Sequence, residues 1–297
     1  MAVASNKSPT LTINWPQSQQ SESPQLTSID SAAAHPSNLW FEAVYRQRRP
    51  RSLKIPRTRL SSRFRQMPRF ELIATTTFGL ESVVTRELEG LGYTGTRTVD
   101  GKVHFSGDER DIARCNMWLR SADRLLIKVG EFHAPDFGAL FDKTVDLPWS
   151  ELLPVDATFP VSGRSVQSRL HAVPSVQGCV KKAIVESLKK KYNRFRFDET
   201  GAEFAIEVAL LRDVATLTID TSGDGLHKRG YREYAGPAPL RETMAAGLLQ
   251  LSYWNRDRQF IDPFCGSGTL PIEAALIGRN MAPGSGRSFI AEDWPWK

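Results

Sequence analysis

The stretch of residues 258–277 constrains the fold more than any other part of the chain. The short apolar run Phe260 and Ile261 predicts the end of a buried strand, and Asp262 follows where that strand would end. Gly266 and Gly268 lie in a tight loop, where glycine permits dihedral angles that other residues resist. A helix is expected next, with apolar residues at 270, 272, 275, 276 and 277. Strand, glycine loop and helix in this order are typical of a nucleotide-type site in a doubly wound α/β fold.

The residues after the glycines argue against a phosphate ligand. A P-loop requires Lys and Ser/Thr after its glycines, whereas Thr269 and Leu270 follow Gly268 here. The dinucleotide pattern requires a third glycine at position 271, which is Pro271. The N-terminus of the expected helix still offers free N–H groups to a ligand. Two interpretations stay open: a loop that binds a cofactor, and a glycine turn of purely structural use.

The string from Asp262 to Thr269, Asp-Pro-Phe-Cys-Gly-Ser-Gly-Thr, resembles the signature of S-adenosylmethionine-dependent methyltransferases, in particular those that act on exocyclic amines of RNA. In that family the loop backbone wraps the methionine part of the cofactor, which carries no phosphate. The resemblance therefore implies S-adenosyl-L-methionine as the cofactor. The implied binding loop consists of Asp262, Pro263, Phe264, Cys265, Gly266, Ser267, Gly268 and Thr269. For Cys265 it implies a packing role and no catalysis.

The net positive charge of the chain comes from its first quarter alone. The 297 residues carry a net charge of +6, but residues 1–69 hold eleven Lys/Arg against three Asp/Glu. Residues 70–297 hold 28 Lys/Arg against 30 Asp/Glu, so their net charge is slightly negative. The overall charge is therefore no evidence that the folded part binds RNA.

Residues 1–69 do not have the composition of a domain. Residues 1–38 are rich in Ser, Gln and Pro and have few apolar residues to bury, and residues 46–69 are rich in arginine. Three interpretations compete. The segment is an RNA-binding arm, since arginines neutralise phosphates; a plastid or mitochondrial transit peptide; or an over-long start assignment with Met67 as the true first residue. The last is favoured because Met67 directly precedes the first orderly strand.

Residues 70–135 predict a small α+β unit. Residues 70–77 read as a strand, and Leu80, Val83, Val84, Leu88 and Leu91 recur at helical spacing. A strand at 102–105, a helix at 108–120 and a strand at 124–132 follow. The order strand, helix, strand, helix, strand predicts a ferredoxin-like unit.

Residues 136–225 form a second block. A helix is expected around residues 137–145, a strand at 158–162, and a long helix from Ser175 to Tyr192. Two strands at 204–211 and 214–219 are joined by Arg212 and Asp213, a connection of hairpin length.

Together the two blocks resemble a THUMP region with its preceding ferredoxin-like unit, an RNA-binding module of tRNA- and rRNA-modifying enzymes. The resemblance is carried by the Phe-Pro-Val strand, residues 165–171, the helix around residues 180–184 and the closing hairpin. It implies phosphate contacts for Arg164, Lys181 and Lys182. For the lysines, a solvated helix face with cations near the helix C-terminus is the alternative, and it applies most to Lys189, Lys190 and Lys191.

The connector to the last part of the chain carries a second resemblance. The string from Leu226 to Arg232, Leu-His-Lys-Arg-Gly-Tyr-Arg, and the following Pro239-Leu-Arg-Glu-Thr243 resemble the entry to the catalytic domain of THUMP-containing 23S rRNA guanine-N2 methyltransferases. A helix is expected here with Pro239 in its first turn. The resemblance implies that Pro239, Leu240, Glu242 and Thr243, with Arg241 between them, border the cofactor pocket. Lys228 and Arg229 are assigned to RNA binding, and a capped helix with ordinary surface charges is the alternative.

The family pattern stops early in this sequence. A complete domain of this type needs roughly six or seven strands, and only the strand at 259–262 is expected here. The family's motif that grips the target amine would lie beyond residue 297, so no catalytic residue is assigned. We therefore expect residues 226–297 to be the start of a Rossmann-like methyltransferase domain in a chain cut short.

The sequence thus predicts an α+β region followed by α/β, and the resemblance implies S-adenosylmethionine-dependent methylation of a guanine N2 in 23S rRNA as the function. An RNA-binding THUMP protein without catalysis and a tRNA guanine methyltransferase are the alternatives. The expected partner is RNA, with rRNA favoured over tRNA. No apolar run is long enough for a membrane, and the three cysteines have no metal-like or disulfide spacing. We expect no metal and a cytoplasmic location, or a plastid if residues 1–66 are a transit peptide.

Overall fold

The computed structural model describes residues 69–232 and 239–295. The three interpretations of the N-terminal segment as a basic arm, a transit peptide or a mis-assigned start lie outside these residues. Within the described ranges, no helix combines the length and the apolar character needed to cross a membrane.

The first unit has the order of elements that is typical of a ferredoxin-like fold, which confirms the prediction. Its elements are β1 (Phe70–Thr76), α2 (Glu81–Gly90), β2 (Arg97–Val99), β3 (Lys102–Gly107), α3 (Glu109–Trp118) and β4 (Ala122–His133). The sequence did not predict β2. All three of its residues are exposed, so the alternation of buried and exposed side chains that marks a strand is missing.

The second unit contains two helices before its long helix and three strands. Its elements are α4 (Phe137–Val145), α5 (Trp149–Leu152), β5 (Val161–Val166), α6 (Val173–Tyr192), β6 (Ile206–Leu211) and β7 (Val214–Asp220). The strand expected at 158–162 begins later, at Val161. Thr158 makes only an isolated bridge to Glu203, and Pro160 has no N–H to donate to a ladder.

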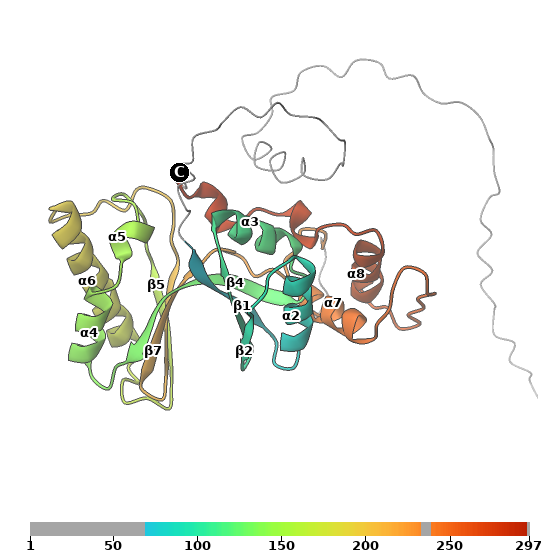
Figure 1. Cartoon of the computed structure of the whole chain (residues 1–297), viewed down its shortest axis with the longest axis horizontal. Coiled ribbons are helices and arrows are strands. Elements are labelled where there is room, and N and C mark those ends of the chain that lie inside the picture. Colours follow the sequence, from blue (N-terminus) through green and yellow to red (C-terminus); the bar gives the residue numbers. More distant parts are fainter. Residues whose placement is uncertain (1–68, 233–238, 296–297) are drawn as a thin grey trace, which may run out of the picture. The chain divides into compact units, whose positions relative to one another are not determined.

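Both units contribute to one seven-stranded sheet, in the order β2-β3-β1-β4-β7-β6-β5 (Figure 1). The twelve-residue strand β4 joins the two halves, because it pairs antiparallel with β1 and with β7. Leu126 of β4, for example, stands between Ile73 of β1 and Asp220 of β7. The register shifts between Lys128 and Gly130, which marks a bulge in the joining strand.

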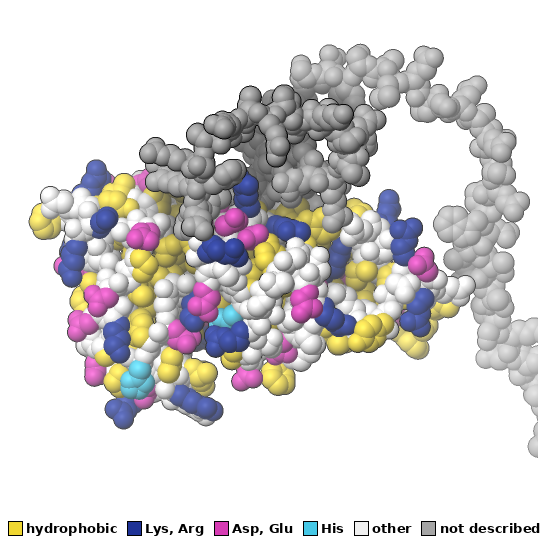
Figure 2. All heavy atoms as spheres, in the orientation of Figure 1, with side chains coloured by type: hydrophobic (Ala, Val, Ile, Leu, Met, Phe, Trp, Pro, Cys, Tyr) yellow, Lys and Arg dark blue, Asp and Glu magenta, His cyan; other side chains and the backbone are white. Residues whose placement is uncertain are grey.

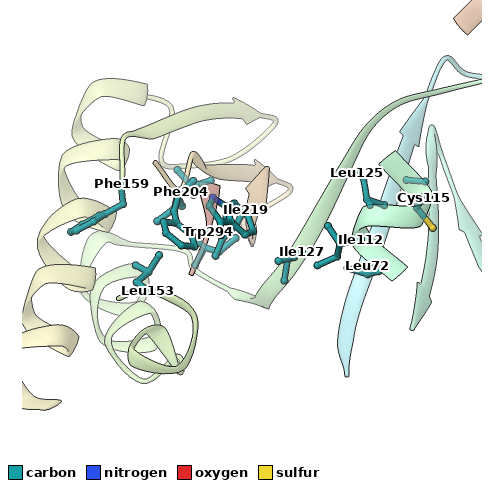
Figure 3. Close-up of a cluster of buried hydrophobic side chains, with 14 of the residues drawn as sticks. Leu72, Ile112, Cys115, Leu125, Ile127, Leu153, Phe159, Phe204, Ile219 and Trp294 are labelled. Carbon is teal, nitrogen blue, oxygen red and sulfur yellow. The ribbon is translucent and has the colours of Figure 1, made fainter. Parts of the chain in front are cut away.

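The core lies between this sheet and its helices. On α6, one apolar stripe is buried, as the helical spacing predicted: Val176, Val180, Ala183, Ile184 and Leu188. Figure 3 shows one group of buried side chains around Leu72, Ile112 and Leu125 in the first unit. A second group surrounds Phe159, Phe204 and Ile219 in the second unit, and Trp294 from the C-terminal segment lies within it.

The described residues 239–295 contain four helical segments joined by loops, and they contain no strand. They form α7 (Glu242–Leu251), α8 (Thr269–Gly278) and the short 3-10 helices η1 (Pro283–Gly286) and η2 (Ile290–Asp293). The prediction of a buried strand at 259–262 is therefore wrong for the described structure. No strand forms there, and Ile261 is 81% exposed. A parallel strand is stable when neighbouring strands pair with it and helices cover it, and no described segment pairs with 259–262. The expected position of Pro239 is also wrong, because α7 begins at Glu242.

Candidate cofactor loop and RNA-binding residues

The loop 262–268 makes a tight turn just before α8. An oxygen of Asp262, Oδ1, accepts the N–H of Phe264 at 3.1 Å, and Gly268 N donates to Cys265 O at 2.8 Å. Gly266 and Gly268 have φ angles of 53° and 77°, in the left-handed region that favours glycine. Gly268 precedes α8 and supplies no side-chain cap to it. No described side chain caps the N-terminus of α8, and the first N–H groups of this helix face the loop.

The loop is open on one side. Phe264 is 94% exposed, and a Cβ placed on Gly266 would meet no atom within 4 Å. The loop thus leaves room for a ligand with no side chain displaced.

The segment before α7 places its polar residues inward. Glu242 and Thr243 are 4% and 1% exposed, whereas Leu240 is 38% exposed. The hydroxyl of Thr243 donates to Asp123 of the first unit at 2.8 Å. Of the residues predicted in this segment, Leu240 is therefore exposed, while Glu242 and Thr243 are buried and Thr243 contacts the first unit.

Arg232 joins the two segments that the sequence assigned to the cofactor. Its Nη2 donates to Leu240 O at 3.1 Å and to Thr269 Oγ1 at 2.7 Å. Its Nε lies 3.2 Å from an oxygen of Glu242. Arg232 is the last residue of the connector string, and its place in the sequence predicts no role for it. A contact over 37 residues leaves no local pattern by which the sequence could have revealed it.

Behind the loop, α8 carries a buried carboxylate. Glu273 is fully buried, accepts the hydroxyl of Tyr231 at 3.0 Å and lies 3.5 Å from Nε of Arg229. Burial raises the pKa of Glu273 above its ordinary value. Arg229 also donates to the carbonyls of Leu226 and Arg120. The assignment of Arg229 to RNA binding is therefore a correction: its guanidinium is buried in the protein, since the residue is 3% exposed.

The other residues predicted to bind RNA do not form one surface. Lys181 on α6 is held by Glu199 at 2.7 Å and lies 3.7 Å from the ring centroid of Phe159. Arg164 on β5 pairs with Glu207 at 3.0 Å, and Lys228 pairs with Asp224 at 2.7 Å.

Their positions in the fold differ as well. Gly163 faces α6, because its Cβ would lie 3.1 Å from Gln177. Since neighbours on a strand alternate between faces, Arg164 lies on the opposite face of the sheet from Lys181.

Lys182 is exposed and borders a shallow groove of about 340 Å³ on α6, which Phe141, Lys181, Val185, Glu186 and Lys189 also line. Figure 2 shows basic and acidic side chains interspersed on the visible face, with no extended patch of one sign. Among the residues that the structure describes, no group of three or more His, Cys, Asp or Glu side chains is arranged to hold a metal ion. On the face that Figure 2 shows, charge alone does not mark an RNA path.

Three family models match successive parts of the chain. Residues 71–126 match the RlmL ferredoxin-like domain, residues 134–220 the THUMP domain, and residues 229–294 the RMKL-like methyltransferase domain. These matches agree with the predicted α+β region.

Curated and solved relatives match across all three parts. A Bacillus subtilis (strain 168) protein named "Putative RNA methyltransferase YpsC" is 51% identical over 232 residues, which are 77% of this chain and 60% of the relative. A crystal structure from Listeria monocytogenes, named as a predicted N6-adenine-specific DNA methylase, is 56% identical with a TM-score of 0.75 and covers 77% of this chain and 60% of its own.

The crystal structure of SMU.472 in complex with S-adenosylhomocysteine (SAH) is 48% identical with a TM-score of 0.74, and covers 77% of this chain and 61% of its own. The chain thus spans about 60% of the length of these relatives.

Proposed function

Because the chain carries an RlmL ferredoxin-like domain, a THUMP domain and a match to the RMKL-like methyltransferase domain, we propose that it is an S-adenosylmethionine-dependent RNA methyltransferase. The names of the relatives support methyl transfer, and the SAH complex of SMU.472 supports the cofactor. RNA is favoured over DNA as the substrate because the THUMP match covers 134–220.

The observation that carries the proposal is the loop 262–268 at the start of α8. The free N–H groups of a helix N-terminus attract a carboxylate, and the methionine end of the cofactor carries one. The carboxylate of Asp262 has one oxygen on Phe264 N, which leaves negative charge for a positive group of the cofactor. Leu240 offers apolar surface beside Thr269, because Arg232 contacts both residues. When bound, the cofactor supplies an electrophilic methyl group on sulfur.

The substrate that we propose is the exocyclic N2 of a guanine in 23S rRNA. This amine is a poor nucleophile because its lone pair is delocalised into the ring, so the enzyme must position it against the methyl group. Positioning of this kind lowers barriers by several kcal/mol. A base within a helix must also leave the stack to reach the cofactor. The loop 262–268 and the start of α8 bind and orient the cofactor. We assign no described residue to binding of the target base.

One observation favours a second function, RNA binding without methyl transfer. The loop is open, with Phe264 94% exposed and Gly266 facing empty space. A cofactor held by one wall of a site binds weakly. This alternative predicts RNA binding by the full chain with no measurable affinity for SAH.

The test is methyl transfer from tritiated S-adenosylmethionine by the full chain. Parallel reactions contain 23S rRNA, tRNA and duplex DNA, and nuclease digestion identifies the methylated nucleoside. The proposal expects N2-methylguanosine in 23S rRNA. Label in tRNA would favour the alternative of a tRNA guanine methyltransferase. N6-methyladenine in DNA would overturn RNA as the substrate.

The location that we propose is the cytoplasm. None of the three cysteines is in a disulfide, which suits a reducing compartment. Fractionation of cells that express the tagged full chain tests this proposal, and recovery in an organelle would contradict it.

A further inference from the structure

We propose that Arg232 is a positioning residue that holds the cofactor loop in its binding geometry. The inference rests on the proposed function and adds to it a residue outside both predicted cofactor segments. Arg232 reaches no ligand in this account. It acts through Thr269 and Leu240, which border the loop and the segment before α7.

The three contacts of Arg232 use two atoms of one planar group. Nη2 serves the carbonyl of Leu240 and the hydroxyl of Thr269, at 3.1 and 2.7 Å, while Nε faces the carboxylate of Glu242 at 3.2 Å. A guanidinium presents its donors in a rigid fork, so one contact fixes the orientation of the others. Leu240 and Thr269 are 29 positions apart in the sequence, and Arg232 makes them neighbours.

The ion pair within this cluster is shielded from water. The side chains of Arg232 and Glu242 are 17% and 5% exposed, so the pair is screened less than a surface pair. Glu242 lies in the first turn of α7, where a carboxylate is favoured by the helix dipole. Glu242 therefore anchors the guanidinium from the side of α7.

The contact with Thr269 leads directly into the loop. Thr269 is the first residue of α8, is 4% exposed, and follows Gly268 with its φ of 77°. Its hydroxyl also lies 3.2 Å from that of Ser267, within the loop. Contacts therefore run from Glu242 through Arg232 and Thr269 to Ser267. They fix the position of the loop where it joins the start of α8. The neighbouring Arg229 cannot replace Arg232, because it is bound to Glu273 and to backbone carbonyls.

The test compares Arg232→Gln, Arg232→Lys and the control Arg279→Gln in the full chain. Arg279 is the C-cap residue of α8 and is exposed, so its replacement removes one positive charge at the end of α8 opposite to Thr269, the residue that Arg232 contacts. Hydrogen–deuterium exchange of the ligand-free protein measures opening of residues 262–270. Calorimetry then measures the Kd for SAH.

For Arg232→Gln we expect about tenfold faster exchange in 262–270, because charge-assisted hydrogen bonds are lost, with unchanged exchange in α6. The Kd for SAH should rise by about the same factor. Arg232→Lys should recover part of both effects, since it keeps the charge for Glu242 and loses the fork. Arg279→Gln should behave as wild type.

Exchange in 262–270 that is unchanged in both Arg232 variants would overturn the inference. If wild type does not bind SAH, the proposed cofactor function fails, while the exchange data still decide the role of Arg232. If wild type and Arg232→Gln bind SAH equally, the cofactor function stands and the inference fails. Should Arg232→Gln unfold, as faster exchange in α6 would show, Arg232→Lys decides by the same criteria.

Discussion

Nε of Arg229 lies 3.5 Å from Oε1 of Glu273, and the two side chains are 2% and 0% exposed. This buried pair connects residues 226–232, the strap that follows β7, to α8, the helix that begins at the cofactor loop. Arg229 also donates to Arg120 O, and Arg120 donates to Met281 O at 2.7 Å. The first unit, the strap and the C-terminal helices are therefore joined through one buried polar cluster.

Replacement of Arg229 by Met should destabilise the protein by about 3–5 kcal/mol, because it leaves the carboxylate of Glu273 buried without its partner. Urea unfolding followed by circular dichroism measures this loss. The double variant Arg229→Met, Glu273→Leu should recover part of the stability, since two apolar side chains replace the pair. The exposed pair of Lys228 with Asp224 provides the control, and Lys228→Ala should cost at most about 1 kcal/mol.

The same variants decide between burial and RNA contact for Arg229. A normal stability of Arg229→Met combined with weakened RNA binding would contradict the buried cluster and restore the assignment made from the sequence.

The contribution of Glu273 to the free energy of unfolding should fall as the pH rises. Burial raises its folded-state pKa, so above the unfolded pKa of about 4.3 the folded state binds more protons than the unfolded state. The contribution of this group is therefore fully present below pH of about 4.3 and is lost as the pH rises through the folded pKa. Glu273→Gln keeps a neutral side chain at every pH and serves as the reference.

The measurement is the difference in free energy of unfolding between wild type and Glu273→Gln across pH 4–8. We expect wild type to lose stability relative to the variant as the pH rises. A difference that does not change with pH would show that the carboxyl titrates alike in both states.

Replacement of Ile261 by Ser should change the free energy of unfolding by no more than about 0.5 kcal/mol, because the side chain is already 81% exposed. Ile184 on α6 provides the buried counterpart, and Ile184→Ser should cost about 2–5 kcal/mol. Thermal unfolding compares the two. A large loss for Ile261→Ser would mean that 259–262 is buried in solution, as the sequence predicted for a strand.

Trp294 should be a major anchor of the C-terminal segment. Its ring stacks on Phe204 at a centroid distance of 4.5 Å, and its Nε1 donates to Glu203 O at 2.8 Å. Trp294→Ala should therefore cost about 3–5 kcal/mol in urea unfolding. Trp294→Phe keeps the stacking and loses the hydrogen bond, so it should cost about 1 kcal/mol. Equal losses in the two variants would contradict the dominant role of the stacked ring.

The parts of the fold that follow local patterns were predictable from the sequence. The stripe on α6 repeats at helical spacing, and the hairpin between β6 and β7 turns at Arg212 and Asp213 as expected. Both turn residues have positive φ, at 50° and 61°, which suits a two-residue hairpin turn. These features depend on neighbours in the sequence, so periodicity and turn length were sufficient.

The features that depend on distant partners were not predictable. An arginine in a polar string reads as exposed, whereas the carboxylate of Glu273, 44 positions later, allows Arg229 to be buried. The run at 259–262 has the composition of a buried strand but needs a paired neighbour, which no described segment provides. The loop 262–268 was located by its glycines, while its link to α7 through Arg232 appeared only in the structure.

Calorimetric titration of the full chain with SAH tests the cofactor loop most directly. Asp262→Ala is the matched variant, because Asp262 shapes the loop through Phe264 N and carries its negative charge. The account predicts saturable binding at one site in wild type, and loss of binding in Asp262→Ala with RNA binding retained. No binding by wild type, or equal affinity in the two proteins, would contradict it.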